Sequence, residues 1–435
     1  MSKRRTVSRD VQAVEQEPWL SGPEVSVQVP LPLVASLRWV RQSFLDLCIL
    51  VGQQILVRGM EEDRNALCGP RGRHDDSRQA VRWGRTASEV TLGGRRIAVD
   101  RLRARVVDGA ELSLPWFEWA AERDPLNEQT LAQVLAGVSM RDYAGTLEPV
   151  PASVGQRAVS KSAVSRRFIA LTTEQLRQWL ARPLGELDLR VVILDGIAFR
   201  DRILLIALGV TTDGTKHVLG LREGTTENAT VCRALLQDLI DRGLPGDRAL
   251  LFVIDGAKGL RKAIAEVFGR LAVVQRCQVH KRRNVLEHLP EERRPQVGRL
   301  LDQAYLQTTN LKPARRQLEQ LAASLEATHP GAAASVREGL EETLTLHRLG
   351  LTGALYRTLR STNPIENLNG TVAHHTRNVR RWRDGRMILR WVAIALVEAE
   401  KHFHRVRGYK DIEHLVAALN HHEQELQLDN QLAVA

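Results

Sequence analysis

The chain has 435 residues, which exceeds one ordinary domain and predicts roughly two to four of them. Its 43% hydrophobic and 26% charged residues are typical of a soluble globular protein. No apolar run approaches the roughly eighteen residues of a membrane helix, and the N-terminal MSKRRTVSRD has no apolar signal core, so we expect a cytoplasmic protein without a membrane partner. Scattered cysteines disfavour a disulfide scaffold: Cys48, Cys68, Cys232 and Cys277.

The charge points to a class of partner. Lysine and arginine number 62 against 51 aspartates and glutamates, and the sequence pI is about 9.9. A basic protein attracts polyanions because it neutralises phosphates and releases their counterions. Nucleic acid is therefore the expected partner, and a basic soluble protein without such a partner is the alternative.

The N-terminal third combines a helix with a basic hairpin. Residues 1–63 begin with a polar tail, and from about residue 31 apolar residues recur at helical spacing. Residues 64–105 hold eleven arginines against four acidic residues, and the segment EVTLGGRRIAV within them predicts two short strands around a Gly-Gly turn. We expect Arg95 and Arg96 to contact DNA phosphates, although an arginine-rich solvated surface explains them equally well.

The next region, residues 111–184, is helical in composition. Residues 156–180 predict two or three short helices, one of them capped by Ser160 or Ser162 with Phe168 on its buried face. Such a helix resembles the recognition helix of a helix-turn-helix unit, and an ordinary amphipathic helix is the alternative. Its polar face supplies three candidates for DNA contact: Ser165, Arg166 and Arg167.

From residue 188 short apolar strands alternate with helices. The pattern predicts three strands, a helix, a strand, a helix and a strand, which form a mixed α/β layer. Two of the apolar runs end in an Asp-Gly pair, VVILDGIAF at Asp195 and LLFVIDGAKGL at Asp255. A third pair, at Asp213, separates two strand-like runs and is best explained as a hairpin turn.

Helices dominate the rest of the chain. Residues 290–360 are polar helices with no strand pattern, and STNPIENLNG (361–370) begins another helix with Pro364 and Glu366 in its first turn. Residues 387–403 predict a buried amphipathic helix.

The carboxylates predict a metal site. We expect Asp195 and Asp255 at strand ends, where side chains point into crevices that bind ligands. With Glu366 they would supply the oxygen ligands that Mg²⁺ or Mn²⁺ prefers, and two such ions about 3.5–4 Å apart can hold both oxygens of a reacting phosphodiester. The alternative for each aspartate is a simple Asp-Gly turn.

A basic segment follows Glu366. TRNVRRWRDGRMILRW (376–391) has six arginines and one acid, which suits phosphate contacts. Trp382 would stack on an unpaired base or wedge into a duplex, unless its indole covers core surface. The candidates for DNA contact here are Arg377, Arg380, Arg381, Trp382 and Arg383.

The ordered segments ILDGIAF, EGTTENATV, VIDGAKGL, QRCQVHKRRNVLEHLP, STNPIENLNGTV and RNVRRWRDGRMILRW resemble the mutator-type transposases of bacterial insertion sequences, from about residue 64 to 420. The resemblance implies an RNase H-like core with a DDE triad, here Asp195, Asp255 and Glu366. It also implies an all-helical insertion between the second aspartate and the glutamate.

The resemblance further includes a Cys-x-x-His pair, Cys277 and His280. A zinc site is disfavoured because no partner pair has suitable spacing, and Cys68 and His74 are distant. We expect the pair to support the active site, with a contact of His280 to the scissile strand and simple packing of Cys277 as the alternatives. We expect the neighbouring Lys281 and Arg282 to contact DNA.

The sequence as a whole predicts an α+β multidomain protein. We expect five regions: an N-terminal helical and β-hairpin region (1–110), a helical DNA-binding region (111–184), the first part of the catalytic core (185–289), a helical insertion (290–360), and the final helices of the catalytic core with the C-terminus (361–435). The resemblance implies a nucleoid-associated homodimeric transposase that binds terminal inverted repeats, cleaves DNA with metal ions and joins the 3′-hydroxyl to target DNA. The alternatives are an RNase H-like nuclease that does not join ends, and a catalytically inactive DNA-binding derivative.

Overall fold

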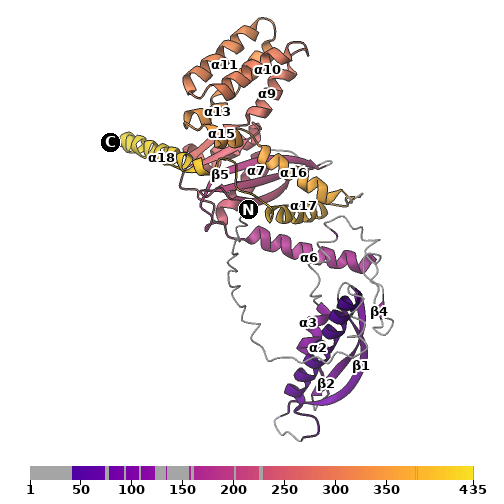
Figure 1. The fold of residues 1–435 in the computed structure, drawn as a ribbon. Helices are drawn as coiled ribbons and strands as arrows, with labels where there is room; N and C mark the ends of the chain where they lie inside the picture. Colours follow the sequence, from indigo (N-terminus) through magenta and orange to yellow (C-terminus); the bar gives the residue numbers. More distant parts are fainter. Residues whose placement is uncertain are drawn as a thin grey trace, which may run out of the picture. The chain divides into compact units, whose positions relative to one another are not determined.

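A computed structural model describes residues 42–73, 78–92, 95–106, 109–122, 134, 156–157, 161–199, 202–224, 229–377, 379 and 381–434 (Figure 1). The chain forms two compact units, the first made of residues 1–133 and 140–163 and the second of residues 134–139 and 164–435. Within the described residues, no helix is both long and apolar enough to span a bilayer. The overall class is α+β, as predicted.

The first unit is built on an antiparallel hairpin. Strand β1 (Ala80–Leu92) pairs with β2 (Arg95–Val106), which confirms the predicted hairpin, although each strand is longer than EVTLGGRRIAV indicated. The Gly-Gly turn lies outside the described residues. The hairpin packs its apolar side chains, among them Val99 and Leu102, against α2 (Gln42–Cys68) and α3 (Pro115–Glu122). Two short strands also pair with β2: β3 (Glu111–Leu112) and β4 (Gln156–Arg157).

A single helix, α6 (Lys161–Ala181), occupies most of the segment for which two or three short helices were predicted. That prediction was wrong, because residues 161–181 contain no glycine or proline and their serines do not interrupt the helix. Phe168, Thr172 and Trp179 form a buried stripe at helical spacing. Most of the remainder of 111–160 lies outside the described residues.

The second unit contains a five-stranded mixed sheet in the order β7-β6-β5-β8-β9. Strands β5, β6 and β7 pair antiparallel, whereas β8 and β9 continue from β5 in parallel. The sequence of three strands, helix, strand, helix and strand is as predicted. The bounds are β5 (Leu189–Phe199), β6 (Arg202–Thr211), β7 (Lys216–Gly224), α7 (Ala229–Asp241), β8 (Leu250–Ile254), α8 (Lys258–Phe268) and β9 (Ala272–Arg276).

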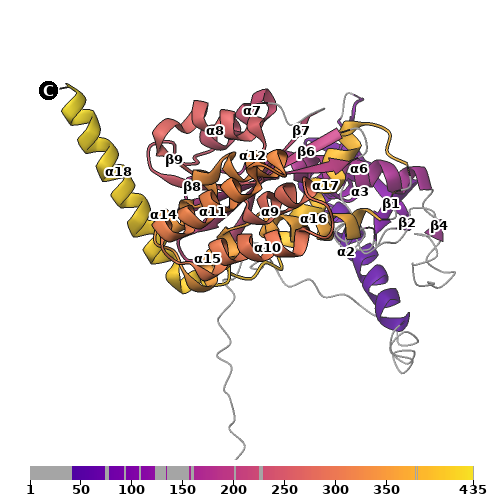
Figure 2. The same cartoon turned by 90° about the horizontal axis from the view of Figure 1, so that it is seen from above.

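Helices cover both faces of this sheet. Val192 and Leu194 pack with α7 and α8, while their neighbours Val191 and Ile193 belong to the core on the opposite face. That opposite core includes side chains of α16 (Asn363–Thr376), α17 (Gly385–Glu400) and α18 (Ile412–Val434). Figure 2 shows α7 and α8 together on one side, and α18 running outward from the unit. The central strands are therefore apolar on both faces, which explains their continuous hydrophobic runs.

A helical block lies between β9 and α16. It contains no strand from residue 290 to 360, as predicted, and has its own apolar core, which includes Val285, Leu301, Leu318 and Val336. Figure 1 shows it at one end of the sheet. Its helices are α9 (Gln278–Glu287), α10 (Arg294–Asp302), the π-helical turn η5 (Gln303–Gln307), α11 (Leu311–Glu326), α12 (Pro330–Arg337), α13 (Leu340–Thr343), α14 (Thr345–Arg348) and α15 (Gly353–Leu359).

Candidate active site

The sheet brings the first two carboxylates together. The parallel ladder between β5 and β8 ends at the pair Leu194 and Ile254, so Asp195 and Asp255 each come directly after the last paired residue. Asp255 follows the end of β8, as predicted. Asp195, however, lies inside β5 and is only 7% exposed, because β5 continues along β6 to Phe199 after β8 has ended.

The two Asp-Gly pairs differ in their glycines. Gly256 has φ of 104°, and a Cβ atom there would overlap the guanidinium of Arg276, so the bend after β8 requires glycine. The Ala257 N–H donates to Asp255 Oδ1 at 2.8 Å. Gly196 instead pairs with Leu205 inside the sheet, and its N–H donates to Asp195 Oδ1 at 3.0 Å. Neither pair is a hairpin turn, whereas Asp213 does occupy the predicted turn between β6 and β7.

The third carboxylate is held by a neighbouring hydroxyl. Glu366 lies in the first turn of α16 with Pro364, as predicted, and its side chain is 38% exposed. Thr362 precedes this helix and donates its hydroxyl hydrogen to Glu366 Oε1 at 3.0 Å. His280 Nε2 lies 3.9 Å from the same oxygen.

Cys277 and His280 join the same cluster. Cys277 is the buried N-cap of α9, and its sulfur accepts the backbone N–H of His280 at 3.4 Å. The Thr362 hydroxyl lies 3.7 Å from this sulfur and 3.3 Å from His280 Nδ1. Thr362, fully buried, therefore contacts three members of the cluster, and we had not assigned it a role from the sequence. Its only sequence signal is its place immediately before the helix of Pro364 and Glu366.

Burial and charge perturb the protonation of this cluster. Burial, and then the negative charge of Asp255, raise the pKa of Asp195 to about 7, while His280 opposes the shift. The hydrogen bond with Cys277, helped by Glu366 and Asp195, raises the pKa of His280 to about 9. Burial alone would raise the pKa of the Cys277 thiol, but its hydrogen bonds with His280 lower it. The cluster thus carries negative charge that its own residues compensate only in part.

This donor set suits a hard divalent cation. The charges of Asp255 and Glu366 both act on Asp195, and its raised pKa reflects burial and repulsion that a bound cation would relieve. As they stand, no three His, Cys, Asp or Glu side chains in the described part of the chain are placed to hold a metal ion.

The predicted DNA contacts have mixed surroundings. Arg96 is exposed on β2 and forms an ion pair with Glu89 at 3.1 Å. On α6, Arg166 is exposed and Ser165 is half-buried. Beyond α16, three predicted arginines are exposed: Arg377, Arg381 and Arg383. The side chains of Arg95, Arg167 and Arg380 lie outside the described residues.

The burial of Lys281 argues against its prediction as a DNA contact. Its side chain is 0% exposed, and its ammonium donates to the Glu338 carbonyl at 2.5 Å and faces the Glu338 carboxylate at 3.7 Å. Burial lowers its pKa to about 8. The side chain thus ties α9 to the end of α12. Arg282, its neighbour, is half-buried and forms an ion pair with Asp302 at 3.0 Å.

Trp382 packs on the protein itself. Its ring meets Phe199 edge to face, with ring centroids 4.9 Å apart, and it is partly buried against the sheet core. This contact fits the alternative in which the indole covers core surface.

Comparisons with known proteins agree on one family. Residues 117–406 match the family described as "Transposase, Mutator family". The chain is 30% identical over 249 residues to a transposase for insertion sequence element IS6120 of Mycolicibacterium smegmatis, which covers 56% of this chain and 74% of the relative. It is 28% identical over 376 residues to that for ISRM5 of Rhizobium meliloti, covering 84% and 89%. It is 28% identical over 258 residues to that for IS256 in transposon Tn4001 of Staphylococcus aureus, covering 54% and 64%.

Proposed function

The chain belongs to the Mutator family of transposases, and we propose that it is a DNA transposase whose active site is the triad Asp195, Asp255 and Glu366. The observation that carries the proposal is that Asp195 and Asp255 follow the last pair of the β5–β8 ladder, while Glu366, beside Thr362 and His280, lies near enough for its charge to act on Asp195. The strand order β7-β6-β5-β8-β9 supports an RNase H-like core, with the helical block as an insertion before the helix of Glu366.

The reaction has two phosphoryl-transfer steps. Water attacks the phosphorus of the phosphodiester at the element end, and the P–O3′ bond breaks. The element strand leaves with a 3′-hydroxyl, and the flanking strand keeps a 5′-phosphate. That hydroxyl then attacks a phosphodiester of target DNA, which forms one new phosphodiester and breaks another. No bond forms between DNA and the protein in either step. The same carboxylate cluster can serve both steps, because in each step an oxygen nucleophile attacks a phosphodiester.

The side chains have separate tasks in this scheme. Asp195 and Asp255 would hold Mg²⁺ or Mn²⁺, with Glu366 completing the donor set. Two such ions, when bound, would activate the attacking oxygen and stabilise charge on the leaving oxygen. Thr362 orients the Glu366 carboxylate by its hydrogen bond of 3.0 Å. His280 carries positive charge beside Asp195 and Glu366, which limits their mutual repulsion.

DNA would be held by the basic surfaces. The hairpin of β1 and β2 and the exposed face of α6 are assigned to the terminal inverted repeats, and Arg377, Arg381 and Arg383 to backbone phosphates near the triad. Because an element has two ends that must be held together, we propose that a homodimer is the active form.

The decisive experiment uses the element's own terminal DNA with Mg²⁺ or Mn²⁺. The intact protein is compared with Asp195→Asn, Asp255→Asn and Glu366→Gln for DNA binding, cleavage and joining. We expect the intact protein to cut and join, and the three variants to bind DNA without either step. Cleavage without joining would indicate a nuclease, and binding without cleavage an inactive derivative. If Glu366→Gln alone stays active, another acid completes the triad.

A further inference from the structure

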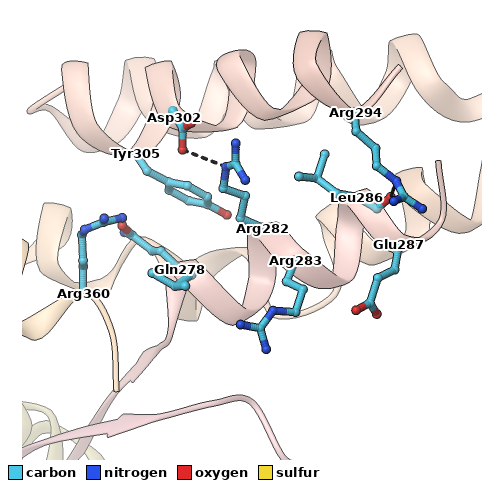
Figure 3. Close-up of a pocket in the computed structure, with 10 residues that line it drawn as sticks. Gln278, Arg282, Arg283, Leu286, Glu287, Arg294, Asp302, Tyr305 and Arg360 are labelled. Atoms are coloured by element: carbon cyan, nitrogen blue, oxygen red, sulfur yellow. Dashed lines mark hydrogen bonds and ion pairs between the residues drawn. The ribbon is translucent and has the colours of Figure 1, made fainter. Parts of the chain in front are cut away.

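A cavity on the helical block is lined by several arginines. It has a volume of about 470 Å³ and is lined by α9, α10, η5 and Arg360 (Figure 3). Four arginines line it against two acids: Arg282, Arg283, Arg294 and Arg360, with Glu287 and Asp302. Figure 3 shows them spread along α9, from Arg360 near Gln278 at its start to Arg294 near Leu286 toward its end. We call this cavity the α9 pocket.

The fold does not neutralise most of this positive charge. Arg282 has Asp302 as its partner, but Arg283, Arg294 and Arg360 form no ion pair with any described acid. Arg294 gives its Nε–H to the carbonyls of Leu286 and Leu289, which fixes the guanidinium without neutralising it. Arg360 is half-buried, and its Nε is fully buried without a hydrogen-bond partner among the described residues. Guanidinium groups without a carboxylate partner at the wall of a cavity suit the binding of an anion.

A glycine leaves room for one of the pocket arginines. Gly298 of α10 faces Arg282, and a Cβ atom at this position would come within 2.6 Å of Arg282 Nη2. A larger residue would shift the end of this flexible side chain, so the glycine leaves room for Arg282 in the wall of the pocket.

The pocket and the triad share the same two segments. The Gln278 N–H donates to the Arg360 carbonyl at 2.9 Å, so the pocket begins where α9 begins. His280 lies on that helix, and Thr362 follows Arg360 by two residues. The ten residues of α9 extend over roughly 15 Å, which is long enough to follow consecutive phosphates of one strand away from the triad.

We propose that the α9 pocket binds the sugar–phosphate backbone of the DNA strand that continues from the reacting phosphodiester. Arginine suits this role because its planar guanidinium binds phosphate oxygens in pairs and stays charged. The inference rests on the proposed function, since it takes the triad as the point from which the strand extends. Glu287 on the rim opposes binding, and its charge limits the affinity.

The test measures the affinity of the full-length protein for terminal DNA by fluorescence anisotropy over a series of KCl concentrations. Arg283→Ala and Arg360→Ala remove pocket charge, and Arg316→Ala is the matched control, because Arg316 is exposed on α11 and does not line the pocket. We expect each pocket variant to lower the slope of log affinity against log salt by about 0.9 per lost phosphate contact, and the control to keep it. Glu287→Gln should bind more tightly, which misfolding does not explain.

A second measurement locates the contact. Single methylphosphonates, which remove the charge of one phosphate, are placed along the strand on either side of the cleavage point. We expect methylphosphonates at a few adjacent positions on one side to weaken DNA binding by the intact protein. They should not weaken binding by Arg360→Ala, because this variant has already lost the contact to those phosphates. Arg283→Ala repeats the test at an exposed residue, whose replacement we expect to leave the fold unchanged.

The outcomes separate the pocket from the function. If the protein cuts and joins but Arg283→Ala and Arg360→Ala bind like Arg316→Ala, the pocket proposal is wrong and the transposase proposal stands. If the pocket variants lose affinity and show the local coupling while the intact protein never cuts, the pocket stands and the activity fails. If inorganic phosphate binds the intact protein but not Arg360→Ala, while the two proteins bind DNA with equal affinity and salt dependence, the pocket is a small-anion site and the proposal is overturned.

Discussion

Two Asp-Gly pairs of the same sheet have opposite electrostatics. Asp213, in the turn between β6 and β7, accepts hydrogen bonds from the hydroxyls of Thr211 and Thr215 and from the Thr215 N–H, which lower its pKa to about 2. Asp195, at the end of the β5–β8 ladder, is buried beside Asp255, and its pKa rises to about 7. The fold satisfies the first carboxylate and leaves the second among like charges. A carboxylate that its own fold does not satisfy is a candidate for ligand binding.

The largest expected difference comes from replacing each of these two aspartates by asparagine. Asp195→Asn should reduce cleavage and joining by more than about 100-fold, because residues that only orient a metal ligand already contribute 10–100-fold. Asp213→Asn should keep full activity and lower the melting temperature slightly, since it keeps one acceptor oxygen in the turn but loses the second oxygen and the charge. Both variants are assayed for turnover and for thermal unfolding. Loss of activity in Asp213→Asn at an unchanged melting temperature would contradict the comparison.

The next effect concerns the hydroxyl that holds the third carboxylate. Thr362→Val has nearly the same shape but cannot donate to Glu366, so we expect a 10–100-fold loss of activity, in the usual range for groups that orient metal ligands. The concentration of Mg²⁺ that gives half-maximal activity should rise, because Glu366 is no longer held in place. Thr362→Ser restores the hydroxyl and serves as the control. If valine and serine variants behave alike, Thr362 only fills space.

The pH dependence of stability should also differ between the two aspartates. The folded pKa of Asp195 lies above its ordinary value of 3.8, so folded protein binds more protons than unfolded protein between pH of about 4 and about 7. Stability of the metal-free protein should therefore fall as pH rises through this window, by a few kcal/mol at most. Asp213 behaves oppositely, because its folded pKa of about 2 gives stability that is present above 3.8 and lost as pH falls toward 2.

Urea unfolding in the presence of a chelator tests this difference. The fall in stability should be absent in Asp195→Asn and reduced by Mg²⁺, which displaces the proton. An unchanged slope in Asp195→Asn would mean that another group titrates in this window.

Sequence reasoning succeeded where local pattern determines structure. Apolar runs predicted the strands, Pro364 predicted the start of α16, and Asp213 was recognised as a turn. It failed where a residue's environment is formed by segments that are distant in the sequence. The place of Asp195 inside β5 depends on β6 extending past β8, and the role of Thr362 depends on contacts with Cys277 and His280, more than eighty residues earlier.

The smallest expected effect concerns two cationic side chains, Lys281 and Arg283. Lys281 follows His280 in a basic run, yet it is fully buried and satisfied by Glu338, whereas the neighbouring Arg283 is exposed without a described acid partner. Lys281→Met keeps the length of the side chain and removes a buried charge. We expect its affinity for DNA and its salt dependence to match the intact protein, while Arg283→Ala lowers both. Anisotropy titrations at two salt concentrations decide this, with circular dichroism as a check on folding. A salt slope that falls in Lys281→Met as far as in Arg283→Ala would show that proximity in sequence, rather than satisfaction by the fold, determines which cations meet the phosphates.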